Sequence, residues 1–541
     1  MLLLHARNLE KYYGERCVLA VEDLQLYEGE RVGIVGANGA GKTTLLRLLL
    51  GLAEPDGGAV ERRCRWAYID QLGWSADQAD RRMLRTFSVA DKDAAGPVSG
   101  GEATRLKIAA ALSADAPLLA ADEPTANLDL EGVETLCGQL ESYPGALLLI
   151  SHDRAVLDRL CSRIWEVEDG AVWDYPGNYS AYRAQAERRR ARRQFEYEQY
   201  REEKWRLEQS IAAAKNRAAK VKKAPGRMGN SEARLHKRAA GESQEKLSGA
   251  AKALESRLSR LEAVEKPREQ GTVRVDFTRT DPPVSRQVIA AERLSFSYGT
   301  RRIFNNAAFT VPNGEKVAVV GANGAGKTTL LRLILEGNDA IRVAPKVRFG
   351  FFAQRFENLD FSRNILANVL ETAVQPQSVV RTILGRLLFR REDVYKPVSV
   401  LSGGELIKVS VAQLVVSACN VLVLDEPTNY LDIPSIEVLQ QVLRDYEGTV
   451  LFVSHDRQFI DALADRLLIV QDGKLDTFAG GYTAWKQAQE HPGQADRAAQ
   501  QKLLLDMRIA ALAARISSNP DDRQALEAEW QALTERKRAL E

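Results

Sequence analysis

The stretch Gly36-Ala-Asn-Gly-Ala-Gly-Lys42-Thr43-Thr44-Leu-Leu-Arg47 decides the fold, because it recurs letter for letter from Gly321 to Arg332, an offset of 285. Three further strings recur at a common offset of 303: Ser99-Gly-Gly-Glu102 at 402–405, Asp122-Glu-Pro-Thr125 at 425–428, and Ser151-His-Asp-Arg154 at 454–457. A repeat of this kind predicts two copies of one structural unit in tandem. The difference of 18 residues places a larger insertion in the second copy, between the first string and the second.

Each copy has the order of an α/β nucleotide-binding domain. An apolar strand (32–35 and 317–320) leads into the glycine-rich string, a helix follows, and a second apolar strand (117–121 and 421–424) precedes the acidic pair. The stretch 117–121 is rich in alanine and is the weakest of these strands by propensity. The fold class predicted from this order is α/β, with two P-loop domains in one chain.

The glycine-rich string has the P-loop form Gly-x-x-x-x-Gly-Lys-Thr in its required context, between an apolar strand and an apolar helix. Its glycines let backbone N–H groups surround phosphates at a helix N-terminus that favours anions. We expect Lys42 and Lys327 to hold the β- and γ-phosphates of ATP, and Thr43 and Thr328 to ligate Mg²⁺. A single match could be a glycine turn with a surface lysine, but two identical copies make that alternative negligible.

The acidic pairs supply the groups that hydrolysis needs. Asp122 and Asp425 end apolar strands, where they can contact the metal through water. Glu123 and Glu426 can polarise the attacking water as general bases. An Asp-Glu pair alone is most often a solvated strand end, but the fixed spacing to the other strings favours the catalytic interpretation.

Composition excludes several classes of protein. The net charge is +2, and no apolar stretch approaches the ~20 residues of a membrane-spanning helix. The N-terminus shows no basic leader before a hydrophobic run, so no export signal is predicted. The five cysteines are scattered and form no Cys-x-x-Cys pair, which argues against a disulfide framework or a zinc site and favours a reducing cytosol.

Residues 184–275 are strongly charged and helix-prone, and they separate the two copies. Apolar residues recur at 4-3-4-3 spacing on two arms: Leu207, Ile211, Ala214, Ala218 and Val221, then Leu247, Ala251, Leu254, Leu258 and Leu261. This pattern predicts an antiparallel helical hairpin that turns near 225–230. A second helical region is predicted at 488–541, where it either packs on a partner molecule or covers its own domain.

The region around the predicted turn is basic. Between 215 and 238 nine Lys or Arg residues stand against one acidic residue, Glu232, and a second basic cluster lies at 188–193. Basic helices often present only a solvated face. A concentrated basic tip suits a polyphosphate backbone, so RNA is the expected partner. The candidate RNA-binding residues are Lys215, Arg217, Lys220, Lys222, Lys223, Arg227, Met228, Arg234, His236, Lys237 and Arg238.

With these strings in hand, both copies resemble the ABC ATPase superfamily, in which Ser-Gly-Gly-Glu is the signature loop of a head-to-tail interface. The resemblance implies that residues 402–405 complete the ATP site built on Lys42. It likewise implies that residues 99–102 complete the ATP site built on Lys327. It also implies Q-loop glutamines at Gln71 and Gln354 that join the metal, D-loop aspartates at Asp129 and Asp432, and switch histidines at His152 and His455. The glutamates 123 and 426 and these two histidines form the expected catalytic set.

The same resemblance completes the set of ATP-binding residues. Tyr13 and Tyr298, each followed by glycine, are similar to the aromatics that stack on adenine. The expected ATP contacts are Tyr13, Gly36, Ala37, Asn38, Gly39, Ala40, Gly41, Lys42, Thr43, Thr44, Gln71, Ser99, Gly100, Gly101 and Glu102 in the first half, and Tyr298, Gly321, Ala322, Asn323, Gly324, Ala325, Gly326, Lys327, Thr328, Thr329, Gln354, Ser402, Gly403, Gly404 and Glu405 in the second. The expected Mg²⁺ contacts are Thr43, Gln71, Asp122, Thr328, Gln354 and Asp425.

Two cassettes joined by a charged helical linker resemble the ABC-F family, and the string 223–237 is similar to the linker of its Vga/VmlR-like antibiotic-resistance branch. The resemblance implies a cytoplasmic, monomeric ATPase that enters the ribosomal tRNA exit site and contacts 23S rRNA and P-site tRNA. The branch relieves inhibition by lincosamides, pleuromutilins and streptogramins A at the peptidyl-transferase centre. A housekeeping factor for stalled ribosomes, a transporter motor and a DNA-maintenance ATPase stay open as alternatives, although neither membrane nor DNA is an expected partner.

The expected domain boundaries follow from these assignments. Residues 1–183 form the first ABC domain, 184–275 the helical-hairpin linker with its basic tip, 276–487 the second ABC domain and 488–541 a helical C-terminal extension.

Overall fold

The computed structural model describes residues 1–70, 80–89, 100–220, 245–246, 248–261, 283–352, 356, 358–389 and 392–490. The chain divides into two compact units. One unit combines Met1–Asp174 with Thr272–Glu541 and holds both cassettes, and the other is the helical segment Tyr175–Gly271. The predicted C-terminal extension and the predicted hairpin turn lie outside the described residues.

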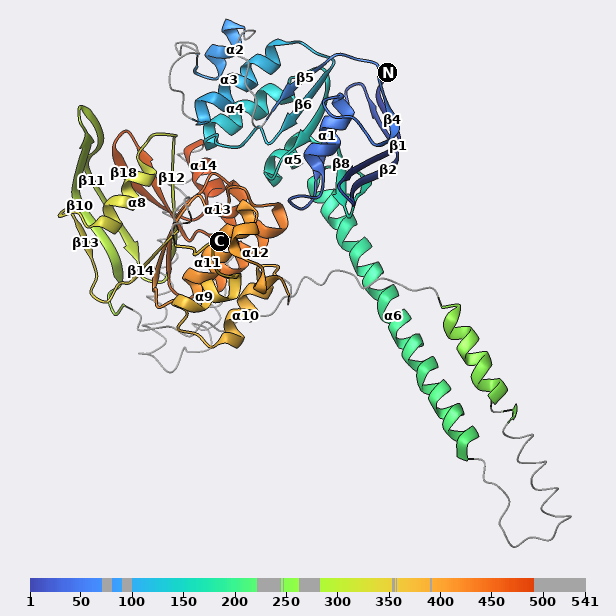
Figure 1. The fold of residues 1–541 in the computed structure, drawn as a ribbon. Helices are drawn as coiled ribbons and strands as arrows, with labels where there is room; N and C mark the ends of the chain where they lie inside the picture. The colour runs from blue at the N-terminus through green and yellow to red at the C-terminus, as the bar shows by residue number, and fades with distance from the viewer. Residues whose placement is uncertain are drawn as a thin grey trace, which may run out of the picture. The chain divides into compact units, whose positions relative to one another are not determined.

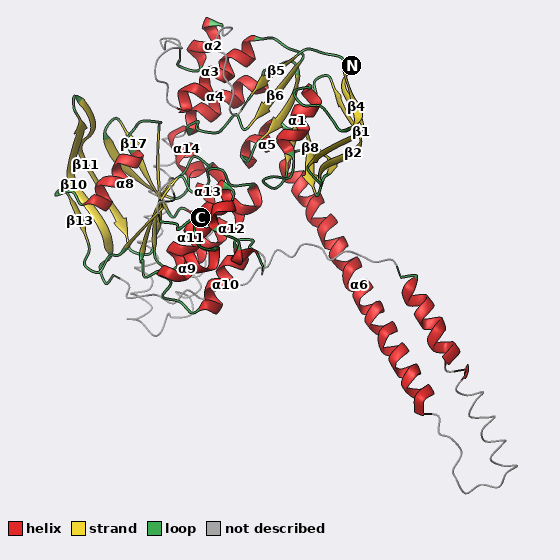
Figure 2. Ribbon diagram, in the orientation of Figure 1, coloured by secondary structure: helices red, strands yellow, loops and turns green. Residues whose placement is uncertain are grey.

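The first cassette is a mixed α/β domain (Figures 1 and 2). Its elements are β1 (Leu2–Tyr13), β2 (Arg16–Tyr27), β3 (Arg31–Val35), α1 (Lys42–Leu50), β4 (Gly57–Arg62), β5 (Trp66–Ile69), α2 (Arg81–Thr86), α3 (Gly100–Ser113), β6 (Leu118–Asp122), α4 (Leu130–Glu141), β7 (Ala146–Ile150), α5 (Arg154–Leu160), β8 (Arg163–Glu168) and β9 (Ala171–Pro176). One sheet has the order β5-β6-β7-β3-β8-β9 and the other the order β2-β1-β4.

The second cassette repeats this plan. Its elements are β10 (Gln287–Tyr298), β11 (Arg301–Pro312), β12 (Lys316–Gly321), α8 (Lys327–Glu336), β13 (Ile341–Val343), β14 (Phe349–Phe352), α9 (Ile365–Thr372), α10 (Gln377–Arg386), the 3₁₀ turns η1 (Asp393–Tyr395) and η2 (Val398–Val400), α11 (Gly403–Val416), β15 (Val421–Asp425), α12 (Ile433–Asp445), β16 (Thr449–Val453), α13 (Arg457–Leu463), β17 (Arg466–Gln471), β18 (Lys474–Ala479) and α14 (Tyr482–Glu490). Its sheets have the orders β14-β15-β16-β12-β17-β18 and β11-β10-β13. The repeated topology confirms the predicted tandem α/β fold.

Alternation along the central strands explains the layers of each cassette. In β12, Val317 and Val319 belong to the core shared with β10, β11 and α8, whereas Ala318 and Val320 belong to the core shared with α9 to α13. Successive strand residues point to opposite faces of a sheet, so a strand covered on both faces reads as a continuous apolar run. The alanine-rich stretch forms β6 as predicted, and all five residues of that strand are buried.

The 18-residue difference between the halves corresponds to helical structure in the second cassette. Helices α9 and α10 lie between the phosphate loop and the signature helix α11, where the described part of the first cassette has only the short α2. Asn364 caps α9 by accepting a hydrogen bond from the N–H of Ala367 at 2.8 Å. The insertion predicted from the repeat offsets is therefore confirmed.

The second unit contains α6 (Tyr179–Lys220), a helix of 42 residues, and a second helical segment at 248–259 (Figure 1). Leu207, Ile211 and Ala251 are buried, as expected for the inner faces of paired arms. Lys215 pairs with Glu255 at 2.7 Å, and Arg257 donates to Glu203 at 2.9 Å, so the two segments lie side by side. Across the described residues, no helix is both long enough and apolar enough to cross a membrane.

Candidate active sites

Each phosphate loop is shaped by glycines that no other residue could replace without strain. Gly41 and Gly326 precede α1 and α8 with φ values of 107° and 108°. At Gly36, with φ 151°, an added Cβ would lie 2.4 Å from the carbonyl oxygen of Val167 on the neighbouring strand. Because real Cβ atoms do not approach oxygen so closely, the loop keeps its form only with glycine at this position.

The two P-loop lysines lie in the same position in both cassettes. Nζ of Lys42 donates to the carbonyls of Gly36 at 2.9 Å and Ala37 at 3.1 Å, and Lys327 makes the equivalent bonds in the second loop at the same distances. Burial lowers the pKa of Lys42, although Glu123, Asp432 and Asp122 oppose that shift. Each lysine is thus a buried cation that donates hydrogen bonds to carbonyls of its own loop. A bound phosphate group can replace those carbonyls as the acceptor.

Two of the residues expected at each metal, a threonine and an aspartate, meet at the ends of β6 and β15. Oγ1 of Thr43 donates to Oδ2 of Asp122 at 2.8 Å, and a Thr328 hydrogen bond to Asp425 repeats the arrangement in the second cassette. Burial raises the pKa of both aspartates. A hydroxyl and a carboxylate in contact, both beside a phosphate loop, form the oxygen donor set that Mg²⁺ prefers.

The glutamates that follow these aspartates have an unusual backbone conformation. Glu123 and Glu426 have φ values of 51° and 53°, a left-handed region that non-glycine residues seldom adopt. Their N–H groups donate to the carbonyls of Ile150 at 2.9 Å and Val453 at 3.0 Å, which hold the two turns in place. Backbone strain of this kind gathers at functional sites, where the surrounding structure compensates for it.

Each glutamate lies next to the switch histidine of its own cassette. Oε1 of Glu123 is 3.4 Å from Nε2 of His152, and the His152 backbone N–H donates to Oε2 at 3.2 Å. Nε2 of His455 is 3.1 Å from Oε1 of Glu426. The structure therefore brings together the four residues expected to be catalytic, as two Glu-His pairs.

Burial controls the protonation of these pairs. It raises the pKa of Glu123 to about 7 and also raises that of Glu426. It lowers the pKa of His152 to about 3 and that of His455 to about 4, with each P-loop lysine adding to the effect. Near neutral pH both histidines are therefore uncharged, and Glu123 is poised between its two protonation states.

Some buried carboxylate oxygens lack a well-oriented donor. Oε1 of Glu123 and both side-chain oxygens of Glu426 make no hydrogen bond within the described structure. Buried polar atoms without partners are rare and call for a ligand or water. Together with the Thr43–Asp122 and Thr328–Asp425 contacts, these oxygens fit the catalytic water and the Mg²⁺ expected here.

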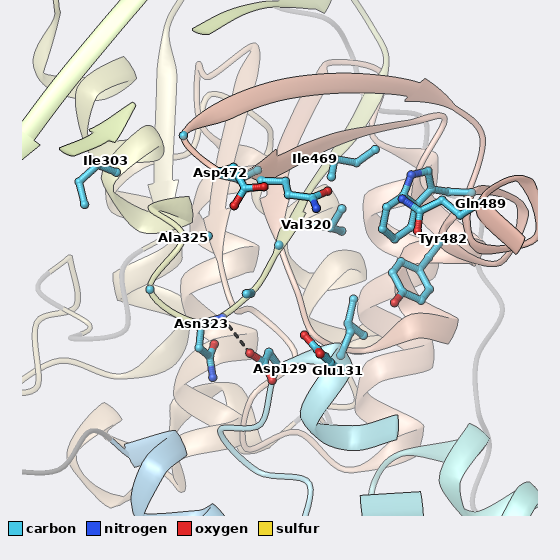
Figure 3. Close-up of a pocket in the computed structure, with 18 of the residues that line it drawn as sticks. Asp129, Glu131, Ile303, Val320, Asn323, Ala325, Ile469, Asp472, Tyr482 and Gln489 are labelled. Carbon is cyan, nitrogen blue, oxygen red and sulfur yellow. Dashed lines mark hydrogen bonds between the residues drawn. The ribbon is translucent and has the colours of Figure 1, made fainter. Parts of the chain in front are cut away.

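The phosphate loop of each cassette contacts the D-loop of the other, and Figure 3 shows one of these two contacts, between Asn323 and Asp129. The backbone N–H of Asn323 donates to Oδ2 of Asp129 at 2.9 Å, and its side-chain amide donates to the carbonyl of Asn127 at 3.1 Å. The mirror contacts run from Asn38 to Asp432 at 2.8 Å and to the carbonyl of Tyr430 at 2.9 Å. The D-loop of each cassette therefore meets the phosphate loop of the other, the head-to-tail arrangement that the resemblance to the ABC ATPase superfamily implies.

The signature loops lie beside the same asparagines. A Cβ added to Gly404 would be 3.4 Å from Nδ2 of Asn38, and one added to Gly101 would be 3.0 Å from Nδ2 of Asn323. Ser402 and Glu405 form a capping box that starts α11. The N-termini of α11 and α3 are thus directed at the opposite phosphate loops, where their dipoles favour an anion.

Sequence reasoning missed two cations that interact with the D-loop aspartates. Arg105 on α3 donates to Oδ1 of Asp129 at 2.7 Å. The position 303 residues later is Lys408 on α11, whose charge helps to lower the pKa of Asp432 against the opposing effect of burial. The repeat offset could have found this pair, because a cation occupies both equivalent positions.

The remaining predicted residues fall into two groups. Tyr13 and Tyr298 end β1 and β10 with 59% and 53% of their surface exposed, which leaves their rings available for stacking. A cavity of about 630 Å³ lies beside the second phosphate loop, with Ile303 and Tyr482 among its lining residues (Figure 3). Gln71, Gln354, Ser99 and most linker-tip candidates lie outside the described residues, which include only the side chains of Lys215 and Arg217 and the helical backbone of Lys220.

Comparison with known proteins agrees with this architecture. The family described as "ABC transporter" matches residues 20–80 and 304–429, and a second family with the same description matches 165–239. Among solved structures, an RNase-L inhibitor superimposes with a TM-score of 0.58 at 20% identity, covering 88% of this chain and 91% of that chain. At that identity the likeness shows the fold alone.

Three curated relatives are similar over most of the chain. The ribosome protection protein VmlR of Bacillus subtilis (strain 168) is 31% identical over 548 residues, covering 99% of this chain and 97% of that protein. The erythromycin resistance ATP-binding protein MsrA of Staphylococcus epidermidis is 33% identical over 83% of this chain and 93% of that protein. The ABC transporter F family member 5 of Arabidopsis thaliana is 31% identical over 88% of this chain and 76% of that protein.

The match to VmlR, over 99% of this chain, extends through both cassettes and the helical segment between them. Each relative is at least 31% identical over at least 83% of this chain, and each match covers at least 76% of the relative's own length. The chain is therefore an ATPase that belongs to the ABC-F family.

Proposed function

We propose that this ABC-F ATPase is a ribosomal protection factor. It enters the tRNA exit site in its ATP-bound form and uses its linker to relieve inhibition by drugs of the peptidyl-transferase centre, of the lincosamide, pleuromutilin and streptogramin A types. The observation on which this proposal depends is the 31% identity over 99% of the chain with a relative named as a ribosome protection protein. The proposal places the protein in the Vga/VmlR-like branch and in the cytoplasm.

The proposed partners are 23S rRNA and P-site tRNA, reached through the linker. Lys215 and Arg217 are exposed near the described end of α6, and a polyphosphate backbone is the natural partner for cations of this kind. Lys215 already pairs with Glu255 at 2.7 Å, so binding RNA through Lys215 would exchange one anionic partner for another. We retain the domain boundaries at 183/184, 275/276 and 487/488 as part of the proposal.

The proposed chemistry assigns one role to each group of the paired sites. Lys42 and Lys327 leave their loop carbonyls to hold the β- and γ-phosphates. The signature helix of the opposite cassette presents its N-terminus to the γ-phosphate, so a complete site requires both cassettes. Tyr13 and Tyr298 stack on the adenines.

Hydrolysis then depends on the Glu-His pairs. Ionised Glu123 or Glu426 accepts a proton from the attacking water, and the neutral histidine beside it donates from its ring to the developing charge on the γ-phosphoryl group. Thr43 with Asp122, and Thr328 with Asp425, would hold Mg²⁺ together with Gln71 and Gln354. Mg²⁺ neutralises charge on the β- and γ-phosphates when it is bound.

Two measurements test the proposal. Expression in a drug-susceptible host should raise the minimum inhibitory concentration of at least one of the three drug types, whereas the Lys42→Ala/Lys327→Ala variant should not. The Glu123→Gln/Glu426→Gln variant with ATP should sediment with ribosomes. Unchanged drug susceptibility would reject the protective role, and failure to sediment would reject ribosome binding itself.

A second candidate is a housekeeping factor that acts on stalled ribosomes without a drug. Its support is the 31% identity over 88% of the chain to the ABC transporter F family member 5 of Arabidopsis thaliana, which is as high as the identity to VmlR. Ribosome sedimentation with no change in susceptibility to any of the three drug types would favour it. Co-purification with membrane permeases would instead indicate a transporter motor, and preferential binding of duplex DNA would indicate a DNA-maintenance ATPase.

A further inference from the structure

An ion pair between the cassettes involves a residue next to the first switch histidine. Arg154, two positions after His152, donates from Nη1 to Oε1 of Glu437 at 3.1 Å. Glu437 lies on α12, five positions after Asp432, whose carboxylate accepts from the phosphate-loop residue Asn38. Helix α12 of the second cassette therefore bridges the phosphate loop and the switch loop of the first.

The mirror arrangement exists at the other site. Arg457, two positions after His455, pairs with Glu134 on α4 and donates to the carbonyl of Leu130 at 2.8 Å. Leu130 directly follows Asp129, which contacts the second phosphate loop. Arg154 with Arg457, and Glu134 with Glu437, are related by the same 303-residue offset as the switch strings. Two copies of one contact indicate a role shared by both sites.

Burial makes these contacts depend on closure. Arg154 is 8% exposed, and its Nε and Nη2 atoms are buried without hydrogen-bond partners in the described structure. A guanidinium in such a place depends on the carboxylates around it, because an uncompensated buried charge is strongly unfavourable. Glu437 is the one that accepts its hydrogen bond, and Asp153 and Asp456 add electrostatic attraction. If the opposite cassette moved away, Glu437 would move with it and Arg154 would lose this partner.

The switch loop is short and transmits the position of Arg154 to the histidine. Asp153, between His152 and Arg154, caps α5 by accepting from the N–H groups of Ala155 at 2.9 Å and Val156 at 3.1 Å. Arg154 is the first residue of α5, so a shift of its side chain moves the cap and the adjoining His152 together. The Glu123–His152 pair is then displaced from the geometry that hydrolysis needs.

We propose that Arg154 and Arg457 are positioning residues for ATP hydrolysis, which align the switch-histidine loop only while the D-loop helix of the opposite cassette is docked. Each ion pair thereby makes turnover at one site conditional on closure of the two cassettes. This inference rests on the catalytic roles proposed for His152 and His455.

Charge exchange tests the contact at the first site. All variants carry Glu426→Gln, so that turnover comes from the site on Lys42. We expect Arg154→Glu and Glu437→Arg each to lower kcat for ATP by about tenfold or more, with KM changed less than about twofold. The double variant Arg154→Glu/Glu437→Arg restores the pair with reversed charges and should recover kcat to within about threefold of the parent.

Two further variants separate positioning from folding. Arg466→Glu breaks an ion pair of 2.9 Å with Glu315 inside the second cassette and should leave kcat unchanged. Arg154→Lys keeps the charge and should retain more activity than Arg154→Gln, which removes it. If the charge-reversal variants do not fold, the comparison of Arg154→Lys with Arg154→Gln shows whether the positive charge at this position is needed for turnover.

The outcomes are distinct. Unchanged kcat in Arg154→Glu, or a double variant as slow as either single variant, would overturn the inference. A rise in KM with constant kcat would also overturn it, because the arginine would then act in nucleotide binding. The assay uses the isolated chain without ribosomes, so failure of the Glu123→Gln/Glu426→Gln variant to sediment with ribosomes would reject the proposed function independently of these results.

Discussion

Asn38 and Asp432 are separated by 394 positions in the chain, yet the backbone N–H of Asn38 donates a 2.8 Å hydrogen bond to Oδ2 of Asp432. Oδ1 of the same carboxylate caps α12 by accepting from the N–H of Ser435 at 3.0 Å. Burial alone would raise the pKa of Asp432, but the donors from Ser435 and Asn38 outweigh it and lower the pKa. One carboxylate therefore stabilises a helix of its own cassette and holds the phosphate loop of the other.

Asp432→Ala removes both functions of this carboxylate. Loss of the cap costs about 1 kcal/mol of stability, and loss of the bond to Asn38 removes a charge-assisted contact worth ~1.5–3 kcal/mol. We expect a lower melting temperature and a fall of about tenfold or more in kcat for ATP, measured by phosphate release. Asn364→Ala is the matched control, because it removes a cap on α9 that touches only its own helix. Equal loss of activity in both variants would contradict the assigned role.

Glu123→Gln/Glu426→Gln keeps the shape of both side chains but removes their basicity. General-base catalysis contributes about 10²–10⁴-fold, so kcat for ATP should fall by that range while ATP affinity changes little. Radiolabelled ATP binding and single-turnover hydrolysis check the two expectations. Glu61→Gln, an exposed residue paired with Arg63, should behave like the parent protein. Near-normal turnover in the double variant would exclude these glutamates as the bases.

The pH dependence of turnover follows from the buried Glu123. It can accept a proton only when ionised, and burial raises its pKa to about 7, so kcat should rise as pH increases from about 6 to 8. His152, with its pKa lowered to about 3, stays neutral across this range, so it adds no second titration to the pH profile of kcat. Glu426→Gln isolates this site for the measurement. A profile already flat above pH 6 would show that Glu123 is not the titrating base.

Gly36→Ala tests the shape of the first phosphate loop. The new Cβ would meet the carbonyl oxygen of Val167 at 2.4 Å in a conformation that alanine seldom adopts, which costs roughly 1–3 kcal/mol. We expect a lower melting temperature and loss of ATP binding at the site on Lys42. Gly138→Ala, in the interior of α4 with no atom near the new Cβ, should instead raise stability by about 0.5–1 kcal/mol. Normal ATP binding by Gly36→Ala would refute the strain argument.

The local motifs could be predicted from the sequence because their chemistry depends on neighbours in the chain. The P-loop lysines, the acidic pairs and the 18-residue insertion all appear where the repeat placed them. Contacts between the cassettes are different, because the distance between Arg154 and Glu437 depends on packing of two domains rather than on spacing. Arg105 and Lys408 were missed for a related reason, because each acts on an aspartate 24 positions further along its own cassette and tertiary packing sets that distance. The offset of 303 nevertheless marks both positions.

The start of α6 depends on a local contact rather than on composition. Helix α6 begins at Tyr179 and runs across the proposed domain boundary at 183/184. The charged composition that marks the linker develops gradually, but the helix begins directly after Asn178, whose side chain accepts from the N–H of Ala181 at 3.1 Å. A helix start depends on one hydrogen bond that an average over many residues does not detect.

The 42 residues of α6 make one uninterrupted helix, roughly 63 Å long at the standard rise per residue. If a rigid helix of that length rotates by about 5° about one end, its other end moves by roughly 5 Å, which is close to the rise of one helical turn. Small rotations at its root therefore become movements comparable to the size of a nucleotide base. The stiffness of α6 consequently determines how far its distal end moves for a given rotation at the other end. A single glycine or proline placed midway would make the helix more flexible and reduce that movement, without contacting either nucleotide site.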